Sequence, residues 1–184
     1  MVDSFSLWRG ICDRGLKEPI SRTIMGFDKL TIKLQEALQA AQRLASKSAH
    51  AELKSAHVLL ELIQQEGGIA VPILEKAGVD LAKLKAALIV ALDREPRVQG
   101  AAAQPQISYG LRATLDAADE LRQKLGDEYL SVEHFLLGSL HAESPAGKLL
   151  VDAGVTEEAL QDALNEVRGS QSVTDEDPEG KYQT

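Results

Sequence analysis

The sequence contains one phrase twice, "KSAHVLLELI" at Lys54–Ile63 and "SVEHFLLGSL" at Ser131–Leu140. The two stretches begin 77 residues apart, and each places a histidine fourth, ahead of an apolar run. In the second stretch Ser131 is a good helix N-cap. His134 then occupies the third helical position, from which a polar side chain can bond back to the N-cap backbone. We therefore expect two helices, with His57 and His134 starting them rather than forming a catalytic or metal site.

The repeat extends well beyond these stretches. At the same offset of 77 residues, ten residues of the first copy meet identical residues in the second: Leu34, Leu38, Ala40, Ala41, Leu44, Lys47, Leu53, His57, Leu59 and Leu60. One residue is then lost, and Ala77-Gly78-Val79 meets Ala153-Gly154-Val155 at an offset of 76. A register held over this length with a single gap indicates a true internal duplication.

Each copy has the pattern of four helices. Apolar residues recur at spacings of three and four along 34–45 and 111–125, which is typical of amphipathic helices. The repeated phrase is the second helix. A short third helix is expected near 71–77 and 147–153, and a fourth runs from after Asp80 or Thr156 to about Asp93 or Arg168, because Asp and Thr are good N-caps.

The composition agrees with an all-α fold, since 44% of the residues are apolar but only 4% are aromatic. One copy of four helices is too small to bury a large share of its surface. We therefore predict two four-helix repeats, about 27–93 and 106–168, packed with pseudo-twofold symmetry into one compact eight-helix domain over residues 25–168. Residues 1–24 are expected to be a disordered extension, and the acidic residues 169–184 a flexible linker or tail.

Several classes of function are disfavoured. The net charge of −8 argues against nucleic acid as a partner. A single cysteine, Cys12, allows neither an intrachain disulfide nor a thiolate metal cluster. No apolar run is long enough for a membrane span, and the first 24 residues lack the apolar core of a signal peptide, so a cytoplasmic location is expected.

The sequence also lacks the motifs of common enzymes. Gly147-Lys148 is followed by leucine, so it does not form a nucleotide-binding P-loop, and the four histidines form no H-E-x-x-H zinc motif. We expect no catalytic residues, no metal and no cofactor. What remains is an unusually broad apolar stripe on 111–125, made by Leu115, Ala117, Ala118 and Leu121. It is either buried between the copies or partly open as a groove for an extended apolar peptide.

Four stretches of the chain are similar to a known family. They are "FDKLTIKLQEALQAAQRLA" (27–45), "QQEGGIAVPILEKAGVD" (64–80), "LGDEYLSVEHFLLGSL" (125–140) and "VRGSQSVTDEDPEGKYQ" (167–183). Together they resemble the N-terminal domain of the ClpB-type disaggregases, a double Clp repeat shared by several Clp ATPases. The resemblance implies an all-helical domain joined to a hexameric ATPase ring. In that family the domain helps capture unfolded or aggregated polypeptide, and the ATP-driven work belongs to the ring.

The family resemblance also implies site residues. Polar positions associated with function match Thr31, Asp127 and Glu133 of this chain, and the apolar groove of the family falls near Ala117 and Leu121. Structural roles remain open for the polar three, because Thr31 can cap a helix, Asp127 can lie in a turn and Glu133 can be a first-turn carboxylate. Glu133 is also a difference between the copies, since the first copy has alanine at that position.

Two functions follow, and a third stays open. The first is the substrate-recruiting domain of a ClpB-type disaggregase, with unfolded polypeptides and the ATPase modules of a Clp hexamer as partners. The second is a stand-alone protein of the same fold that acts as an adaptor or regulator of a Clp ATPase. An unrecognised enzyme is the third. The domain by itself is expected to be a monomer, because the parts that build the ring are absent from this sequence.

Overall fold

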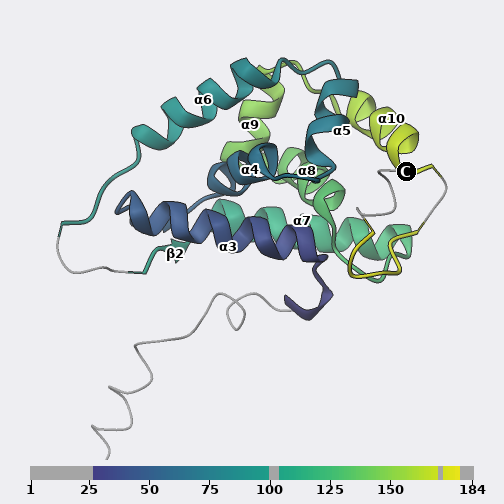
Figure 1. Cartoon of the computed structure of the whole chain (residues 1–184), viewed down its shortest axis with the longest axis horizontal. Helices are drawn as coiled ribbons and strands as arrows, with labels where there is room; N and C mark the ends of the chain where they lie inside the picture. Colours follow the sequence, from purple (N-terminus) through teal and green to yellow (C-terminus); the bar gives the residue numbers. More distant parts are fainter. Residues whose placement is uncertain (1–26, 100–103, 170–171, 179–184) are drawn as a thin grey trace, which may run out of the picture.

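The structure is a computed structural model that describes residues 27–99, 104–169 and 172–178. The extension expected at residues 1–24 lies outside these ranges. After a short 3-10 turn, the first repeat forms α3 (Ile32–Lys47), α4 (Ser55–Gln64), α5 (Ala70–Lys76) and α6 (Leu81–Asp93). The second repeat forms α7 (Tyr109–Leu125), α8 (Val132–His141), α9 (Pro145–Asp152) and α10 (Glu157–Arg168). Within these described ranges the predicted eight-helix fold is confirmed, with the repeated phrase at α4 and α8 (Figure 1).

The expected caps account for several helix ends. Asp80 accepts a hydrogen bond from the Lys83 backbone at the start of α6, and Thr156 accepts one from the Ala159 backbone at the start of α10. The turns ahead of these caps pass through Gly78 at φ 83° and Gly154 at φ 90°. Glycine adopts this left-handed backbone without the steric cost that a Cβ brings, which explains why both copies have it.

Two short backbone pairings, which the sequence did not predict, join the repeats. Strand β1 (Glu52–Leu53) pairs in parallel with β2 (Gln106–Ile107), so that Leu53 faces Ile107. A second parallel bridge joins Leu30 to Leu130. The 77-residue offset maps Leu30 onto position 107 and Leu53 onto Leu130, so the two pairings are the same contact made twice. This is the backbone expression of the pseudo-twofold symmetry.

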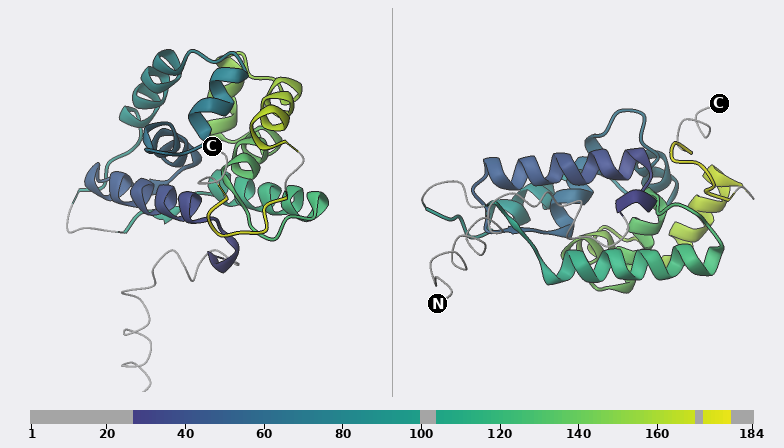
Figure 2. Two further views of the ribbon diagram at one scale, coloured as in Figure 1. Left: turned by 45° about the vertical axis from the view of Figure 1, so that its right-hand side comes forward. Right: turned by 90° about the horizontal axis from the view of Figure 1, so that it is seen from below.

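The two repeats also interlock through their third helices. Helix α5 of the first repeat packs on α8 and α10 of the second, and α9 of the second packs on α4 and α6 of the first. The centres of α4 and α8 are fully buried at equivalent positions, Leu59 and Leu136. Buried apolar residues of both repeats form one continuous core, which Figure 2 shows from two further directions. Within the described ranges, no helix has the length and apolar character needed to cross a membrane.

Part of the segment that is expected to be a flexible linker or tail lies against the domain. Residues 172–178, which we call the strap, run back between the end of α7 and the start of α3 (Figures 1 and 2). The backbone N–H groups of Glu128 and Ile32 donate to the carbonyls of Val173 and Glu176, at 2.9 and 2.8 Å. The acidic composition predicted a solvated linker because it gave no sign that one valine would be buried against the domain.

Candidate functional site

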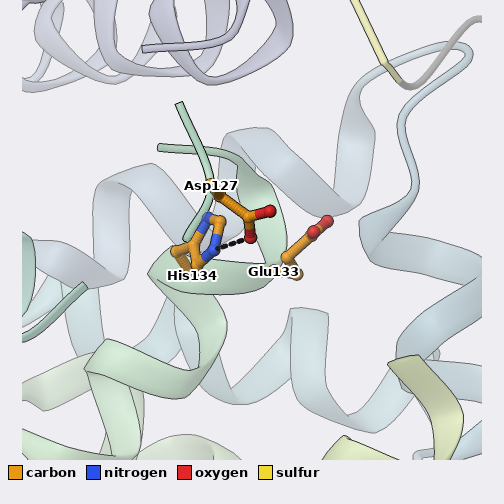
Figure 3. A group of neighbouring side chains, drawn as sticks. All are labelled: Asp127, Glu133 and His134. Atoms are coloured by element: carbon orange, nitrogen blue, oxygen red, sulfur yellow. Dashed lines mark hydrogen bonds and ion pairs between the residues drawn. The ribbon is translucent and has the colours of Figure 1, made fainter. Parts of the chain in front are cut away.

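The histidine of the second phrase starts its helix as expected. Ser131 is the N-cap of α8, and the Nδ1 of His134 lies 3.0 Å from the Ser131 backbone nitrogen, whose N–H it accepts. The proton of the neutral ring is therefore on Nε2, which donates to Oδ2 of Asp127 at 3.0 Å (Figure 3). Burial lowers the pKa of His134 to about 4, although the neighbouring Asp127 carboxylate acts in the opposite direction.

The start of α4 in the first repeat has the same arrangement as the start of α8, but the partner of its histidine is a different residue type. His57 accepts the N–H of Lys54 at its Nδ1, at 3.0 Å, and its Nε2 lies 2.9 Å from Nδ1 of His50. Position 50 corresponds to Asp127 through the 77-residue offset. Burial, and then the proximity of His50, lowers the pKa of His57 to about 4. The first repeat therefore has a neutral histidine pair where the second has a histidine beside a carboxylate.

The turn that carries Asp127 is fixed by an arginine. Gly126 ends α7 in the left-handed conformation at φ 73°, and the chain then reverses toward α8. Arg122 donates to the carbonyls of Asp127 and Glu128 at 2.8 and 3.3 Å, and its Nε donates to Oδ1 of Asp119 at 2.7 Å. The expected placement of Asp127 in a turn is what the structure shows.

A second arginine brings two of the expected site residues together. Arg168, the last residue of α10, donates through Nη1 to Oε1 of Glu133 at 3.1 Å and through Nη2 to Oδ1 of Asp127. Asp127 is 3% exposed and Glu133 is 2% exposed. Burial alone raises the pKa of Asp127, but the hydrogen bonds from Arg168 and the Val173 N–H outweigh it and place the pKa below its ordinary value. Such buried carboxylates are tolerated because a cation and hydrogen bonds compensate for the lost water.

Thr31 lies next to this cluster through the backbone. Its N–H donates to the carbonyl of Leu130 at 3.0 Å, and the residue is fully buried. Thr31 occupies the N-cap position of α3, but its side chain makes no capping hydrogen bond there. The N–H of Ile32 instead donates to the strap at Glu176. The start of α3, the α7–α8 turn and the strap thus meet at one place, where both repeats contribute.

Ala117 and Leu121 lie on α7, one turn apart and half-buried, and Leu121 packs against the core. Their apolar side chains have no polar group with which to bond the ion-pair cluster of Asp127, Glu133 and Arg168. Their counterparts in the first repeat, Ala40 and Leu44, line a shallow cleft of about 820 Å³ together with Arg43, Lys47 and Glu61. The second repeat has Gly138 at the position of Glu61. The absence of a side chain there allows α7 and α8 to pack closely.

The buried trio Asp127, Glu133 and His134 has the residue types of a metal site, with ligand atoms within 4.8 Å of one another (Figure 3). Its bonding is that of an ion-pair network instead. Both carboxylates form ion pairs with the guanidinium of Arg168. The two ring nitrogens of His134 are hydrogen-bonded, one to the Ser131 backbone and the other to Asp127. A metal ion would have to displace this arginine, so we assign the cluster no metal or cofactor chemistry.

The two arginines were missed by the sequence reasoning. Arg168 lies 35 residues from Glu133 and 41 from Asp127, and no local pattern links them. Arg122 offered a weak signal, because an arginine three residues after Asp119 and five before Asp127 can satisfy the carbonyls that end a helix. The strap residue Val173 carried no signal that periodicity could detect.

The chain matches one protein family model and has sequence relatives among known proteins. The family model for the Clp repeat (R) N-terminal domain matches residues 29–153. The chain is 42% identical over 153 residues to the chaperone protein ClpB of Mycobacterium tuberculosis, and 37% identical over 159 residues to that of Pseudomonas putida. These alignments cover 83% and 86% of this chain but 18% and 19% of the two relatives. The chain therefore spans about a fifth of their length, and the matched part is their non-catalytic N-terminal domain.

Solved structures agree in fold. The Hsp104 N-terminal domain from Candida albicans has a TM-score of 0.71 at 20% identity and covers 82% of this chain and 99% of its own. A complex of the ClpV N-domain with a VipB peptide has a TM-score of 0.63 at 22% identity, covering 80% of this chain and 91% of that one. At such identities the likeness concerns the fold alone. Since the family model matches more than half of the chain, and close relatives share its sequence, this chain belongs to the Clp repeat N-terminal domain family.

Proposed function

We propose that this domain recruits unfolded or aggregated polypeptide for a ClpB-type, ATP-dependent disaggregase in the cytoplasm and delivers it to the ATPase ring. The observation that carries the proposal is the meeting of Thr31, Asp127 and Glu133 at one face of the domain. An extended segment of this same chain lies on that face and is held mainly by backbone hydrogen bonds. Backbone bonding suits the capture of polypeptides of unrelated sequence, because every peptide unit offers the same donor and acceptor.

The apolar part of the site is assigned to Ala117 and Leu121 on α7. Both side chains are half-buried, so each retains apolar surface that a bound chain can cover. The family supports the assignment, and a peptide complex exists for the ClpV N-domain, whose fold this chain shares. We expect weak binding, because a recruiting domain has to release its cargo to the ring.

The test is a titration with reduced and carboxymethylated α-lactalbumin, a permanently unfolded protein, followed by NMR of the backbone amides. Resonances of Thr31, Ala117, Leu121, Asp127 and Glu133 should move together. Leu121→Gln should weaken binding about fivefold, which corresponds to the loss of about 1 kcal/mol of apolar contact. Leu125→Gln is the matched control, because Leu125 lies one turn further along α7 and is already 53% exposed.

Two results would count against this site. If the titration moves resonances elsewhere on the domain, polypeptide binds at a different surface. If Leu125→Gln weakens binding as much as Leu121→Gln, the effect reflects general loss of surface apolarity rather than a defined contact.

A further inference from the structure

The strap is bound to the domain in a defined register. The N–H of Val173 donates to Oδ1 of Asp127 at 2.8 Å, and its carbonyl accepts from Glu128 at 2.9 Å. Three residues later the carbonyl of Glu176 accepts from Ile32 at 2.8 Å. The strap thus contacts both repeats, and it satisfies an N–H at the start of α3 that the helix itself leaves without a partner.

The strap docks with few apolar contacts of its own. Val173 is 0% exposed, yet it lies outside the continuous core that unites the two repeats. Pro178 is the other buried residue of the strap, while Ser172, Thr174 and the three acidic residues at 175–177 are exposed. An element with so little buried apolar surface belongs to the low-stability end of a folded domain, where local opening is frequent.

Docking of the strap also contributes to the burial of the candidate site residue Asp127. Asp127 uses one carboxylate oxygen for both the Val173 N–H and Arg168, and Arg168 in turn covers Glu133. Removal of the strap takes one donor from Asp127 and frees three backbone N–H groups, those of Ile32, Glu128 and Tyr129. The surface then offers a carboxylate acceptor and three backbone donors, which is the complement of an extended peptide.

We propose that the strap is an intramolecular ligand, and that unfolded polypeptide binds at this surface by displacing it and taking the same backbone register. The inference rests on the proposed function and adds its mode of recognition. The ligand is an extended segment with a small or β-branched apolar residue where Val173 lies. That residue is not proline, since its N–H must reach Asp127. The neighbouring side chains of the ligand point to solvent and are not selected.

The decisive variant is Val173→Asp in the full chain, which places a carboxylate in the buried position next to Asp127. The matched control is Thr174→Asp, because it adds the same charge one residue later at an exposed position. Hydrogen exchange should accelerate at the amides of Ile32 and Glu128 in V173D but not in T174D. Val173→Gly is a milder second variant, and circular dichroism of each verifies that the domain remains folded.

Binding of reduced and carboxymethylated α-lactalbumin is then compared among the variants. If the strap is undocked in about 10% of parent molecules, only that fraction can bind the unfolded protein. Full undocking of the strap in V173D and V173G should therefore tighten the apparent Kd about tenfold. T174D should bind as the parent does. A synthetic peptide SVTDEDP, added to V173D, should restore slow exchange at Ile32 and Glu128 and compete with the unfolded protein. The same peptide with proline in place of valine should do neither.

The outcomes separate the two proposals. If all variants bind the unfolded protein with the same affinity although exchange shows that the strap has left, the strap is not a competitor and this inference is wrong, while the proposed function stands. If neither parent nor variants bind the unfolded protein, the proposed function itself fails. If V173D binds more weakly than the parent, the strap is part of the binding surface rather than its occupant, which also overturns the inference.

Discussion

At the residue scale, His57 and His134 make the same hydrogen bond to the N-cap backbone of their helices, but their other ring nitrogens have different partners. The position three residues into the helix explains the bond from each ring to the N-cap backbone, and this much follows from sequence spacing. The partner of the other ring nitrogen does not follow, because His50 and Asp127 are set by the turn that precedes each helix. The sequence pointed to Glu133 as the difference between the copies, but its ion pair with Arg168 depends on how α10 lies in the fold.

The buried histidines should make the domain sensitive to mild acid. Burial lowers the pKa of His134 from 6.5 to about 4, so between these values the unfolded chain binds a proton that the folded chain does not. Unfolding is therefore favoured as the pH falls from 6.5 toward 4. The contribution of His134 is complete above 6.5 and amounts to about 3 kcal/mol lost by pH 4. The lowered pKa of Asp127 acts at still lower pH, because its stabilisation is lost only as that carboxylate is protonated.

Urea unfolding at pH 7 and pH 5 measures this effect. His134→Gln should lower the free energy of unfolding at pH 7, and it should flatten its dependence on pH between the two conditions, since one titrating group is gone. Leu136→Ala is the control, because it destabilises the same helix without removing a titratable group and should keep the slope of the parent chain. An unchanged slope in His134→Gln would show that this histidine is not the acid-sensitive group.

At the element scale, the helices were predictable where apolar periodicity and capping residues agree. The two-residue strands and the close packing of α7 against α8 were not. The strand pieces β1 and β2 are too short for any alternation to be visible. The tight crossing of α7 and α8 depends on Gly138. A Cβ added there would come within 2.7 Å of the Thr114 carbonyl oxygen and 2.8 Å of the Ala118 nitrogen. Glycine inside a helix is otherwise unfavourable, so its presence indicates this close approach.

Gly138→Ala should therefore destabilise the domain by about 2–3 kcal/mol, although alanine is the better helix former. The clashing atoms belong to the backbone of α7, so they can be relieved only by moving that helix. Gly110→Ala is the matched control, because its nearest neighbour is a proline ring carbon at 3.2 Å and a small shift suffices. Chemical denaturation of both variants compares them, and equal stabilities would mean that α7 can move away at little cost.

At the scale of the whole molecule, the duplication predicted one domain rather than two, and the reason is visible in the packing. Each third helix lies against the opposite repeat, and both repeats contribute to the same core. The sequence could predict the number of helices and the symmetry, since both follow from the repeated register. It could not predict which helices cross between the repeats, because equivalent sequences pack equally well in many arrangements.

This interlocking predicts a single cooperative unfolding transition. Leu59→Ala and Leu136→Ala form a matched pair, since the two leucines occupy equivalent positions in the two repeats and are fully buried. Each should lower the free energy of unfolding by about 3 kcal/mol, the usual cost of removing a buried leucine side chain. Because the core is shared, either variant should shift the loss of structure in both repeats by the same amount.

The ring resonances of His57 and His134 report separately on the two repeats in an NMR-monitored urea titration. Their native signals should disappear at the same urea concentration in the parent chain and in both variants. If Leu59→Ala loses the His57 signal at lower urea than the His134 signal, the repeats unfold independently. In that case the pairings of Leu30 with Leu130 and of Leu53 with Ile107 would be contacts between two domains rather than parts of one.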